Sequence, residues 1–347
     1  MRFYTGQHRH YCGVDLHARS MYLCILDQTG TVRLHKNVRA TPEAFLKAVA
    51  PYREELVVAV ECMFTWYWVA DLCAAEGIPF VLGHALYMKA IHGGKAKNDR
   101  IDAHKIAVLL RGGMLPQAYV YPARMRATRD LLRRRLHFTR KRAELLTHIE
   151  NTNSQYNRPA FAKKLTYAAN RVDVSERFAD PAVQQSMAVD LGLIAYYDGM
   201  LRELENFILR SAKHHDANAL YRLRTVPGIG KILALVILYE VHDLTRFARP
   251  QELASYARLV KCAKGSAGKI HGTSGANIGN VHLKWALSEA AIGFLRKNPA
   301  GKAYYERLVR KHGKGKALTV LAHKLARAVY YIWKRDQVFD QEKFLAA

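Results

Sequence analysis

Acidic residues are scarce in this chain. It carries 29 Asp and Glu against 54 Lys and Arg in 347 residues, which gives a formal net charge of +25 and an isoelectric point near 9.9. An excess of positive charge on this scale favours a polyanionic partner, and nucleic acid is the commonest one. A basic protein of the membrane surface is the alternative, but the sequence has no lipidation motif and no amphipathic anchor. We therefore expect a nucleic-acid partner and no membrane.

Long hydrophobic runs and paired cysteines are also missing. The longest apolar run, residues 57–70, is interrupted by Glu61 and is too short to span a bilayer. The opening segment MRFYTGQHRH has no apolar core and does not resemble a signal peptide. The five cysteines include no C-x-x-C pair and several lie in apolar runs, so they are interpreted as reduced core residues. These absences favour a cytoplasmic, nucleoid-associated protein.

The first third of the chain has the pattern of an α/β domain. Three β-rich segments precede an alternation of helices and strands, and the predicted order is strands at 11–17, 20–27 and 32–38, a helix at 41–53, a strand at 55–61, a helix at 64–77, a strand at 78–84 and a helix at 99–113. Thr41 and Pro42 form a favourable start for the first helix. This order predicts a mixed sheet with helices on its faces.

Beyond residue 122 the sequence is predicted to be helical and strongly basic. Residues 124–142 hold nine Arg or Lys and one acid, Asp130. Apolar stripes at residues 132–149 and 187–208 predict two helices that form an antiparallel, coiled-coil-like pair, with ordinary bundle helices as the alternative. The basic helix is a candidate phosphate-tracking surface, and a merely solvated face is the other interpretation. Its candidate nucleic-acid contacts are Arg124, Arg126, Arg129, Arg133, Arg134 and Arg135.

The last third, predicted to be mostly helical, begins with a second phosphate-binding candidate, the segment VPGIGKILALVI. Its Gly-x-Gly turn before an apolar helix is typical of a helix-hairpin-helix element, in which backbone N–H groups contact phosphate. Gly228, Gly230 and Lys231 are the residues that would make this contact. A tight turn between helices, without any ligand, is the alternative.

A Gly/Ser/Lys-rich stretch follows at residues 263–290. Its glycines let the backbone approach a ligand closely, and Lys264, Lys269 and Lys284 supply positive charge. A serine in such a stretch can act as a nucleophile on a phosphate that is activated by metal, and by composition Ser266 and Ser274 are equal candidates. A flexible polar loop that touches phosphate without chemistry is the competing interpretation.

Four carboxylates form a candidate metal site. Asp15 lies in an apolar strand, where a lone carboxylate costs several kcal/mol unless it is compensated. Glu61 ends a second buried-looking strand, which an RNase H-like sheet would place beside the first, and Asp99 and Asp102 share one helix face. Four such groups repel one another, and Mg²⁺ or Mn²⁺ relieves this repulsion. The alternatives are an Asp15 hydrogen-bonded to a loop and an Asp99/Asp102 pair that stabilises a helix N-terminus.

Six blocks of the sequence together resemble one known family. They are GVDLHARSMYLCILD, VVAVECMFTWYWVADLC, GGKAKNDRIDAHKIAVLLRGG, VPGIGKILALVI, GTSGANIGNVHLKWALSEAA and HGKGKALTVLAHKLARAVYY. In this order they resemble the DEDD-type insertion-sequence transposases, the family numbered one hundred and ten, whose members are also called bridge-RNA-guided recombinases. The resemblance implies a RuvC-like RNase H-fold domain over residues 8–120, a coiled-coil region over 121–215 and a C-terminal transposase domain over 216–347.

The resemblance also implies roles for individual residues. The family's metal-binding acids match Asp15, Glu61, Asp99 and Asp102, and its catalytic serine, which forms a covalent 5′-phosphoserine link to DNA, matches Ser266. Many members have Ser-Gly at the nucleophile, whereas this chain has Ser266-Ala267 and offers Ser-Gly at Ser274 instead. The family implies target and donor DNA and a structured guide RNA as partners. It also implies a homo-oligomer, a dimer or tetramer, whose subunits share the active site.

The leading hypothesis is therefore a Mg²⁺-dependent DNA transposase or recombinase of an insertion sequence. The alternative is a RuvC-like Holliday-junction endonuclease that hydrolyses DNA with the acids alone. A non-enzymatic nucleic-acid-binding protein and an actin-like ATPase are further possibilities, although the ATPase is disfavoured because the chain shows no second Gly-rich phosphate loop of the right kind.

Overall fold

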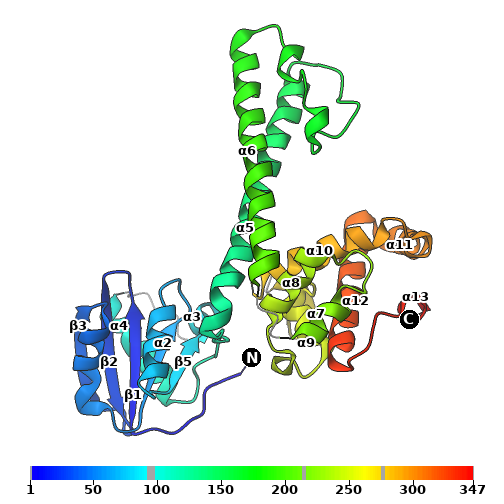
Figure 1. Cartoon of the computed structure of the whole chain (residues 1–347). Coiled ribbons are helices and arrows are strands. Elements are labelled where there is room, and N and C mark those ends of the chain that lie inside the picture. The colour runs from blue at the N-terminus through cyan, green and yellow to red at the C-terminus, as the bar shows by residue number, and fades with distance from the viewer. Residues whose placement is uncertain (1, 92–97, 213–215, 275–277, 347) are drawn as a thin grey trace. The chain divides into compact units, whose positions relative to one another are not determined.

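The computed structural model describes residues 2–91, 98–212, 216–274 and 278–346 (Figure 1). The chain divides into two compact units, one extending to Arg124 and the other from Met125 to the carboxyl terminus. The finer division of the second unit, into a coiled-coil region and a C-terminal domain, stays a prediction.

The first unit contains the mixed sheet that the sequence predicts. Its strands are β1 (His10–Leu16), β2 (Ser20–Asp27), β3 (Val32–Arg39), β4 (Leu56–Glu61) and β5 (Phe80–Gly83), in the order β3-β2-β1-β4-β5. The pairs β1–β2 and β2–β3 are antiparallel, whereas β4 pairs in parallel with both β1 and β5. The architecture is compatible with an RNase H-like transposase domain.

Four helices accompany this sheet: α1 (Pro42–Val49), α2 (Tyr67–Ala75), α3 (Ala85–Ile91) and α4 (Asp99–Arg111). The predicted start of α1 is confirmed, because the Thr41 side chain accepts a hydrogen bond from the Ala44 amide and Pro42 opens the helix. The prediction for α2 began too early, since residues 64–66 precede the helix. The short helix α3 was not predicted.

Along the central strands, successive side chains point to opposite faces of the sheet, and both faces are apolar. Cys12 and Val14 of β1 pack with Phe45 and Val69 in one core, on the face covered by α1 and α2. The side chains between them point the other way, and Tyr11 packs in a second core with residues of β4, β5 and α4. This alternation is the period of two expected of a strand buried on both faces.

The helix α4 packs directly on β1 at Gly13. A Cβ atom at Gly13 would lie 2.3 Å from the Ala103 carbonyl oxygen and 2.4 Å from the Ala107 amide nitrogen, both in the backbone of α4. No other residue type has room there, because real Cβ contacts are never this short. Gly13 therefore sets how closely α4 approaches the strand that carries Asp15.

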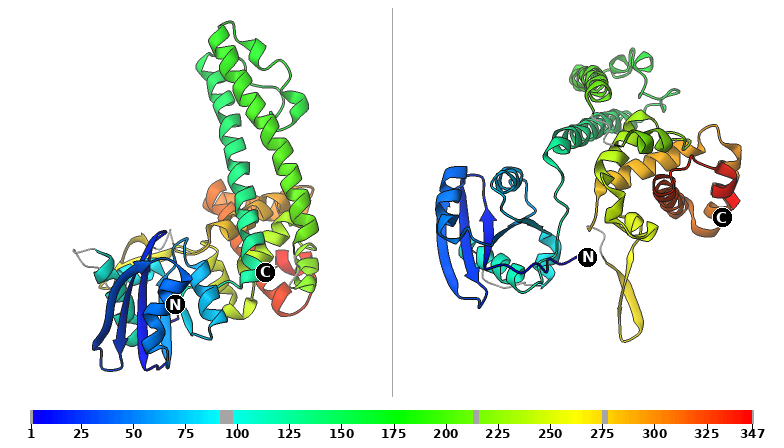
Figure 2. Two further views of the ribbon diagram at one scale, coloured as in Figure 1. Left: turned by 60° about the vertical axis from the view of Figure 1, so that its left-hand side comes forward. Right: turned by 60° about the horizontal axis from the view of Figure 1, so that its bottom comes forward.

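The second unit begins with two long helices, α5 (Ala123–Gln155) and α6 (Pro181–Ser211), which lie side by side in every view (Figures 1 and 2). Three ion pairs between them, which join Arg135 to Glu205, Arg142 to Asp198 and His148 to Asp190, show that the helices run antiparallel. Leu146 and Ile149, in the C-terminal half of α5, pack in one core with Met187 and Ile194, in the N-terminal half of α6. Whether the pair supercoils or dimerises stays a prediction.

The remainder of this unit is mostly helical, as expected. It contains α7 (Ala217–Leu223), α8 (Lys231–Val241), α9 (Pro250–Tyr256), a hairpin of β6 (Cys262–Ser266) and β7 (Lys269–Ser274), α10 (Val281–Leu295), α11 (Pro299–His312), α12 (Lys314–Lys334) and α13 (Gln341–Ala346). The helix α8 is buried from Ala234 to Val241. It shares one hydrophobic core with α10, α12 and the first turns of α5. Within the described residues, no helix is both long and apolar enough to span a membrane.

The cysteine prediction holds for three residues of five. Cys12, Cys24 and Cys73 are buried and unpaired, and burial raises the pKa of the Cys24 and Cys73 thiols to about 12. Cys62 and Cys262 are exposed instead, so the interpretation of all five as core residues was wrong. Both of these lie at strand termini, where an apolar neighbourhood in the sequence does not guarantee burial.

Candidate functional site

The register of the parallel strands places Asp15 beside Glu61. Val14 of β1 pairs with Val60 of β4, so the next residue on each strand lies at the same level and on the same face of the sheet. This is the face covered by α4. The predicted adjacency of the two strands is therefore confirmed, and it brings two carboxylates to the carboxyl ends of neighbouring strands.

The first turn of α4 supplies the other two acids. Asn98 caps this helix, its side-chain oxygen accepting a hydrogen bond of 2.8 Å from the Ile101 amide. Because Asn98 already provides the cap, Asp99 and Asp102 are not required as capping residues, although the helix dipole favours both. Lys105 lies one turn further along, with its ammonium nitrogen 3.5 Å from the Asp102 carboxylate.

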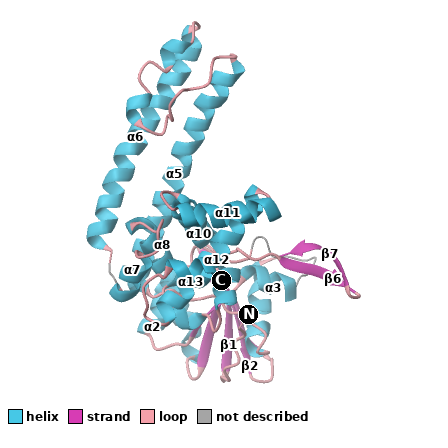
Figure 3. Cartoon of the chain, turned by 90° about the vertical axis from the view of Figure 1, so that its right-hand side faces the viewer, coloured by secondary structure: helices cyan, strands magenta, loops and turns pink. Residues whose placement is uncertain are grey.

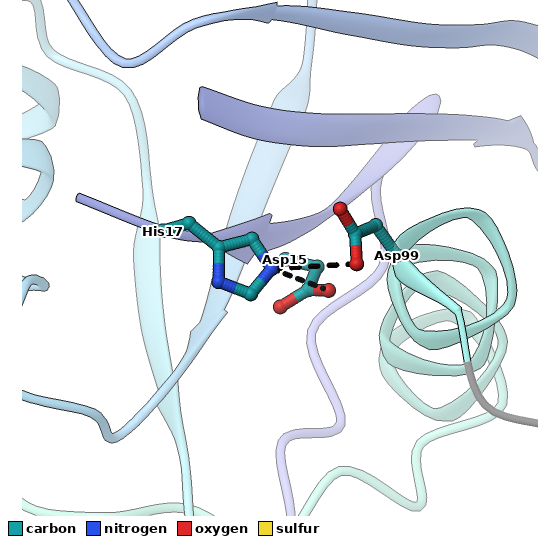
Figure 4. A group of neighbouring side chains, drawn as sticks. All are labelled: Asp15, His17 and Asp99. Atoms are coloured by element: carbon teal, nitrogen blue, oxygen red, sulfur yellow. Dashed lines mark ion pairs between the residues drawn. The ribbon is translucent and has the colours of Figure 1, made fainter. Parts of the chain in front are cut away.

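Asp15, Asp99 and His17 converge in front of the sheet (Figure 4). The Nε2 atom of His17 lies 3.4 Å from Asp15 Oδ2 and 3.4 Å from Asp99 Oδ1. One donor atom from each of the three residues lies within 4.8 Å of the others. The side chain of Asp15 is largely covered, whereas about half of each of the other two is exposed.

His17 was not predicted as a site residue. It follows β1 directly and stands two positions beyond Asp15, so the alternation of a strand places both on the same face. The pairing of β1 with β2 extends to this residue, since the His17 backbone amide donates a hydrogen bond of 2.9 Å to the Ser20 carbonyl oxygen. The period of two in GVDLH is the signal that could have identified it.

Burial and neighbouring charges set the electrostatics of Asp15. Burial raises the pKa of the Asp15 carboxyl, the charges of Asp99 and Asp102 raise it further, and His17 opposes them. A divalent cation would relieve this repulsion, because it offsets several negative charges at one point. Asp15, Asp99 and His17 therefore fit a metal site chemically, whereas Glu61 and Asp102 are not part of this group.

The predicted Gly/Ser/Lys loop is a β-hairpin (Figures 2 and 3). Ser266 ends β6 and pairs with Lys269 at the start of β7, and Ala267 and Gly268 form the two-residue turn with φ values of 49° and 75°. Positive φ at both positions is the geometry of the tight hairpin turn that usually takes Asn-Gly. Ser266 is thus exposed at the tip, whereas Ser274 lies at the other end of the hairpin, opposite Cys262.

Residues 256–258 and residues 279 and 280 flank the hairpin, form its base, and are hydrogen-bonded to one another. The Asn280 amide donates a hydrogen bond of 2.6 Å to the Tyr256 carbonyl oxygen, and Arg258 Nε donates one of 2.8 Å to the Gly279 carbonyl oxygen. Gly279 has a φ of 106°, and a Cβ there would lie 2.5 Å from the Tyr256 oxygen. These contacts hold residues 256–258 close to residues 279 and 280.

The base of the hairpin is linked to a buried ion-pair network around Glu240 of α8. Arg129 Nε donates to this carboxylate at 3.0 Å, Arg133 donates two hydrogen bonds at 2.6 and 2.9 Å, and Asn280 donates one at 2.7 Å. Burial alone would raise the pKa of Glu240, but the hydrogen bonds and charges of the two arginines outweigh it and lower the pKa to about 2. Asn280 also caps α10 through its side-chain oxygen.

These contacts bear on the arginines predicted to bind nucleic acid. Arg126 and Arg129 are only 5% and 7% exposed. Arg133 is engaged by Glu240, and Arg135 by Glu205. Side chains so placed are not favoured as phosphate contacts. Arg124 and Arg134 are exposed, and for them the contact stays a prediction.

The glycine turn before α8 has a packing role. A Cβ at Gly228 would lie 2.3 Å from the Phe294 amide nitrogen, so the glycine is required because the turn packs on the backbone of α10. Gly230 caps α8, and Lys231 is exposed at its first position. Lys264, Lys269 and Lys284 are exposed as well. Phosphate binding by these residues stays a prediction.

Comparisons with known proteins give a consistent result. A DEDD-type IS110 transposase model matches residues 12–157, and a second model, described as the transposase IS116/IS110/IS902 family, matches residues 220–306. The first range contains all four candidate acids and the second contains the hairpin with Ser266.

Three relatives are similar to the chain. An uncharacterized 43.6 kDa protein of insertion element IS110 from Streptomyces coelicolor is 35% identical over 36% of this chain and 31% of its own length. The transposase for insertion sequence element IS1111A from Coxiella burnetii is 25% identical over 94% of this chain and 90% of its own length. The putative transposase y4qE from Sinorhizobium fredii is 24% identical, covering 86% and 75%.

Proposed function

The chain belongs to the IS110 family of insertion-sequence transposases, and on this premise we propose that it cuts and rejoins DNA with a metal-binding carboxylate site and a serine nucleophile. The observation that carries the proposal is the convergence of Asp15 and Asp99, from a strand and a helix, in a chain with a net charge of +25. Carboxylates gathered in so basic a chain are suited to the chemistry of a polyanionic substrate.

The proposed metal ligands are Asp15, Glu61, Asp99 and Asp102. Their oxygen donors suit Mg²⁺ or Mn²⁺. Burial first, and then the charges of Asp99 and Asp102, raise the pKa of Asp15, and a bound cation would oppose both effects. A bound ion would stabilise the attacking and leaving oxygens of a phosphodiester displacement. The chain's own contribution is rigidity, because β1 and β4 fix two of the acids and the direct packing of α4 on Gly13 fixes the others.

The proposed nucleophile is Ser266. Its Oγ attacks the phosphorus of a DNA phosphodiester, the bond from phosphorus to the 3′ oxygen breaks, and a 5′-phosphoserine link forms. The hydroxyl loses one proton and the departing 3′ oxygen gains one, so the step is balanced. Attack by a 3′-hydroxyl on the phosphoserine reverses it and rejoins a strand. The exposed position of Ser266 beside Lys269 supports this role, since an ammonium group there can hold the phosphate.

We also propose a structured guide RNA and a homo-oligomer, a dimer or tetramer. The high positive charge supports an RNA partner in addition to DNA. Sequencing of the RNA that co-purifies with the full chain tests the first part, and light scattering of the purified protein tests the second. Recovery of only random cellular RNA, or of a monomer at every concentration, would contradict the respective part.

An excision assay tests the proposal directly. Cells carry the gene with its native flanking DNA, and the excised junction is counted by quantitative PCR. Asp15→Asn and Ser266→Ala are each expected to abolish excision. The matched controls, Asp173→Asn at an exposed position and Ser274→Ala at the other end of the hairpin, are expected to retain it. Excision by Ser266→Ala would exclude the serine mechanism, and excision by Asp15→Asn would exclude the metal site.

A further inference from the structure

We propose that His17 is itself a ligand of the ion held by Asp15 and Asp99, and that the site therefore takes a first-row transition ion in preference to Mg²⁺. This inference rests on the proposed function, because it presupposes that the carboxylates bind a cation. It adds a nitrogen donor to a set of donors that is otherwise all oxygen. It also changes which metal the site selects.

The distances are long for strong hydrogen bonds and fit coordination of a common ion. Nε2 of His17 is 3.4 Å from an oxygen of Asp15 and 3.4 Å from an oxygen of Asp99. Strong hydrogen bonds between nitrogen and oxygen are shorter, at about 2.7–3.2 Å. Around one ion with bonds of about 2.1–2.3 Å, neighbouring ligands at right angles lie about 3.0–3.3 Å apart. The three donor atoms, all within 4.8 Å of one another, therefore have the spacing of ligands around a common ion.

The backbone holds His17 at this place. Its amide is tied to the Ser20 carbonyl oxygen at the turn from β1 to β2, and its side chain lies on the same face as Asp15 (Figure 4). About half of the imidazole is exposed, as is about half of the Asp99 side chain. The partly open cluster leaves coordination positions for water and for a phosphate oxygen.

An imidazole nitrogen changes the selectivity of such a site. Mg²⁺ prefers oxygen ligands and gains little from imidazole, whereas first-row transition ions bind nitrogen donors more strongly. Mn²⁺ is the practical probe because it is paramagnetic. Directly coordinated nitrogen is detected by pulsed electron paramagnetic resonance through its coupling to the electron spin.

The test uses the full-length chain, Mn²⁺ and Mg²⁺. We expect bound Mn²⁺ to show coupling to a coordinated ¹⁴N in the wild type and in the control variant His10→Gln, whose side chain contacts the Glu54 backbone at the far end of β1. His17→Gln is expected to abolish this coupling. The variant is also expected to weaken Mn²⁺ binding by about tenfold or more, the scale seen for changes around metal ligands, with little change in Mg²⁺ binding.

The possible failures are distinguishable. Bound Mn²⁺ without nitrogen coupling in the wild type would overturn the inference and leave the carboxylate site intact. Tighter Mn²⁺ binding by His17→Gln would also overturn it, because it would mean that His17 competes with the ion. Absence of Mn²⁺ binding, or binding that Asp15→Asn does not weaken, would overturn both the inference and the metal site of the proposed function.

Discussion

Replacing Gly13 by alanine is expected to move apart the two halves of the carboxylate site. The new Cβ would lie 2.3 Å from the Ala103 carbonyl oxygen and 2.4 Å from the Ala107 amide nitrogen. Both are backbone atoms, so no side chain can rotate away to make room. The helix α4 would have to withdraw by about 1 Å to restore ordinary contacts of about 3.5 Å, and Asp99 and Asp102 would withdraw with it.

This substitution is expected to lower both the stability of the protein and the rate of the reaction. Extra volume in a closely packed interface lowers the free energy of unfolding by about 1–3 kcal/mol. A displacement of about 1 Å at a catalytic group lowers the rate by about a hundredfold. The loss of activity should therefore exceed what partial unfolding explains, because a domain with several kcal/mol of stability stays almost fully folded after losing 1–3 kcal/mol.

The assay pairs excision in cells with urea denaturation of the purified chain, monitored by circular dichroism. Gly192→Ala is the matched control, since a Cβ there meets nothing within 4 Å and lies on the helix α6. This control should unfold at the same or a slightly higher urea concentration and should excise normally. Gly13→Ala with wild-type excision and wild-type stability would refute the claim that this close approach positions the acids.

Three further predictions concern other parts of the molecule. Glu240→Gln removes the buried charge that compensates the buried Arg129 and the partly buried Arg133, so the free energy of unfolding should fall by about 3–5 kcal/mol at pH 7 in urea titrations. Because the folded-state pKa of Glu240 is about 2, below its ordinary value of 4.5, the difference between wild type and variant should shrink as pH falls from about 4.5 towards 2; a difference that does not depend on pH would contradict this reasoning. Asp15→Asn should abolish excision and should raise the urea midpoint at pH 7 in the absence of metal. The pKa of Asp15 is raised, so its ionised form lowers the stability of the folded state at any pH above that pKa. A lower midpoint for Asp15→Asn would contradict this reasoning. Arg124→Ala and Arg134→Ala should each reduce the slope of log K for DNA against log salt by about 0.9 if each side chain contacts one phosphate, and unchanged slopes would exclude both contacts.

The sequence predicted the sheet and the neighbourhood of the acids because both depend on local patterns. The apolar segments around Asp15 and Glu61 are strands by composition, and the expectation of an RNase H-like sheet placed those strands side by side, as the structure has them. The convergence of Asp15 with Asp99 also needs the tight packing at Gly13, which no local pattern reveals. His17 was not predicted because it is an imidazole, whereas the pattern that identified the site is one of carboxylates.

The basic helix shows why the remaining residues could not be predicted. Arg129 and Arg133 look like members of a solvated or DNA-binding stripe until Glu240, more than 100 residues later, is seen to bind both. Glu240 itself lies in an apolar segment that reads as a simple core helix. The hairpin that carries Ser266 was hidden for a different reason, because its turn has Ala267 where a residue with a stronger preference for positive φ would signal a hairpin.

The most direct test of the central claim is the identity of any residue joined covalently to DNA. Tagged full-length protein is captured under denaturing conditions from cells that carry the gene with its native flanks, the DNA is digested, and the peptides are mapped by mass spectrometry. The account predicts a nucleotide remnant on Ser266, lost in Ser266→Ala and retained in Ser274→Ala. A remnant on Ser274, or cleaved DNA with no protein attached, would contradict it, and the second result would favour hydrolysis by the acids alone.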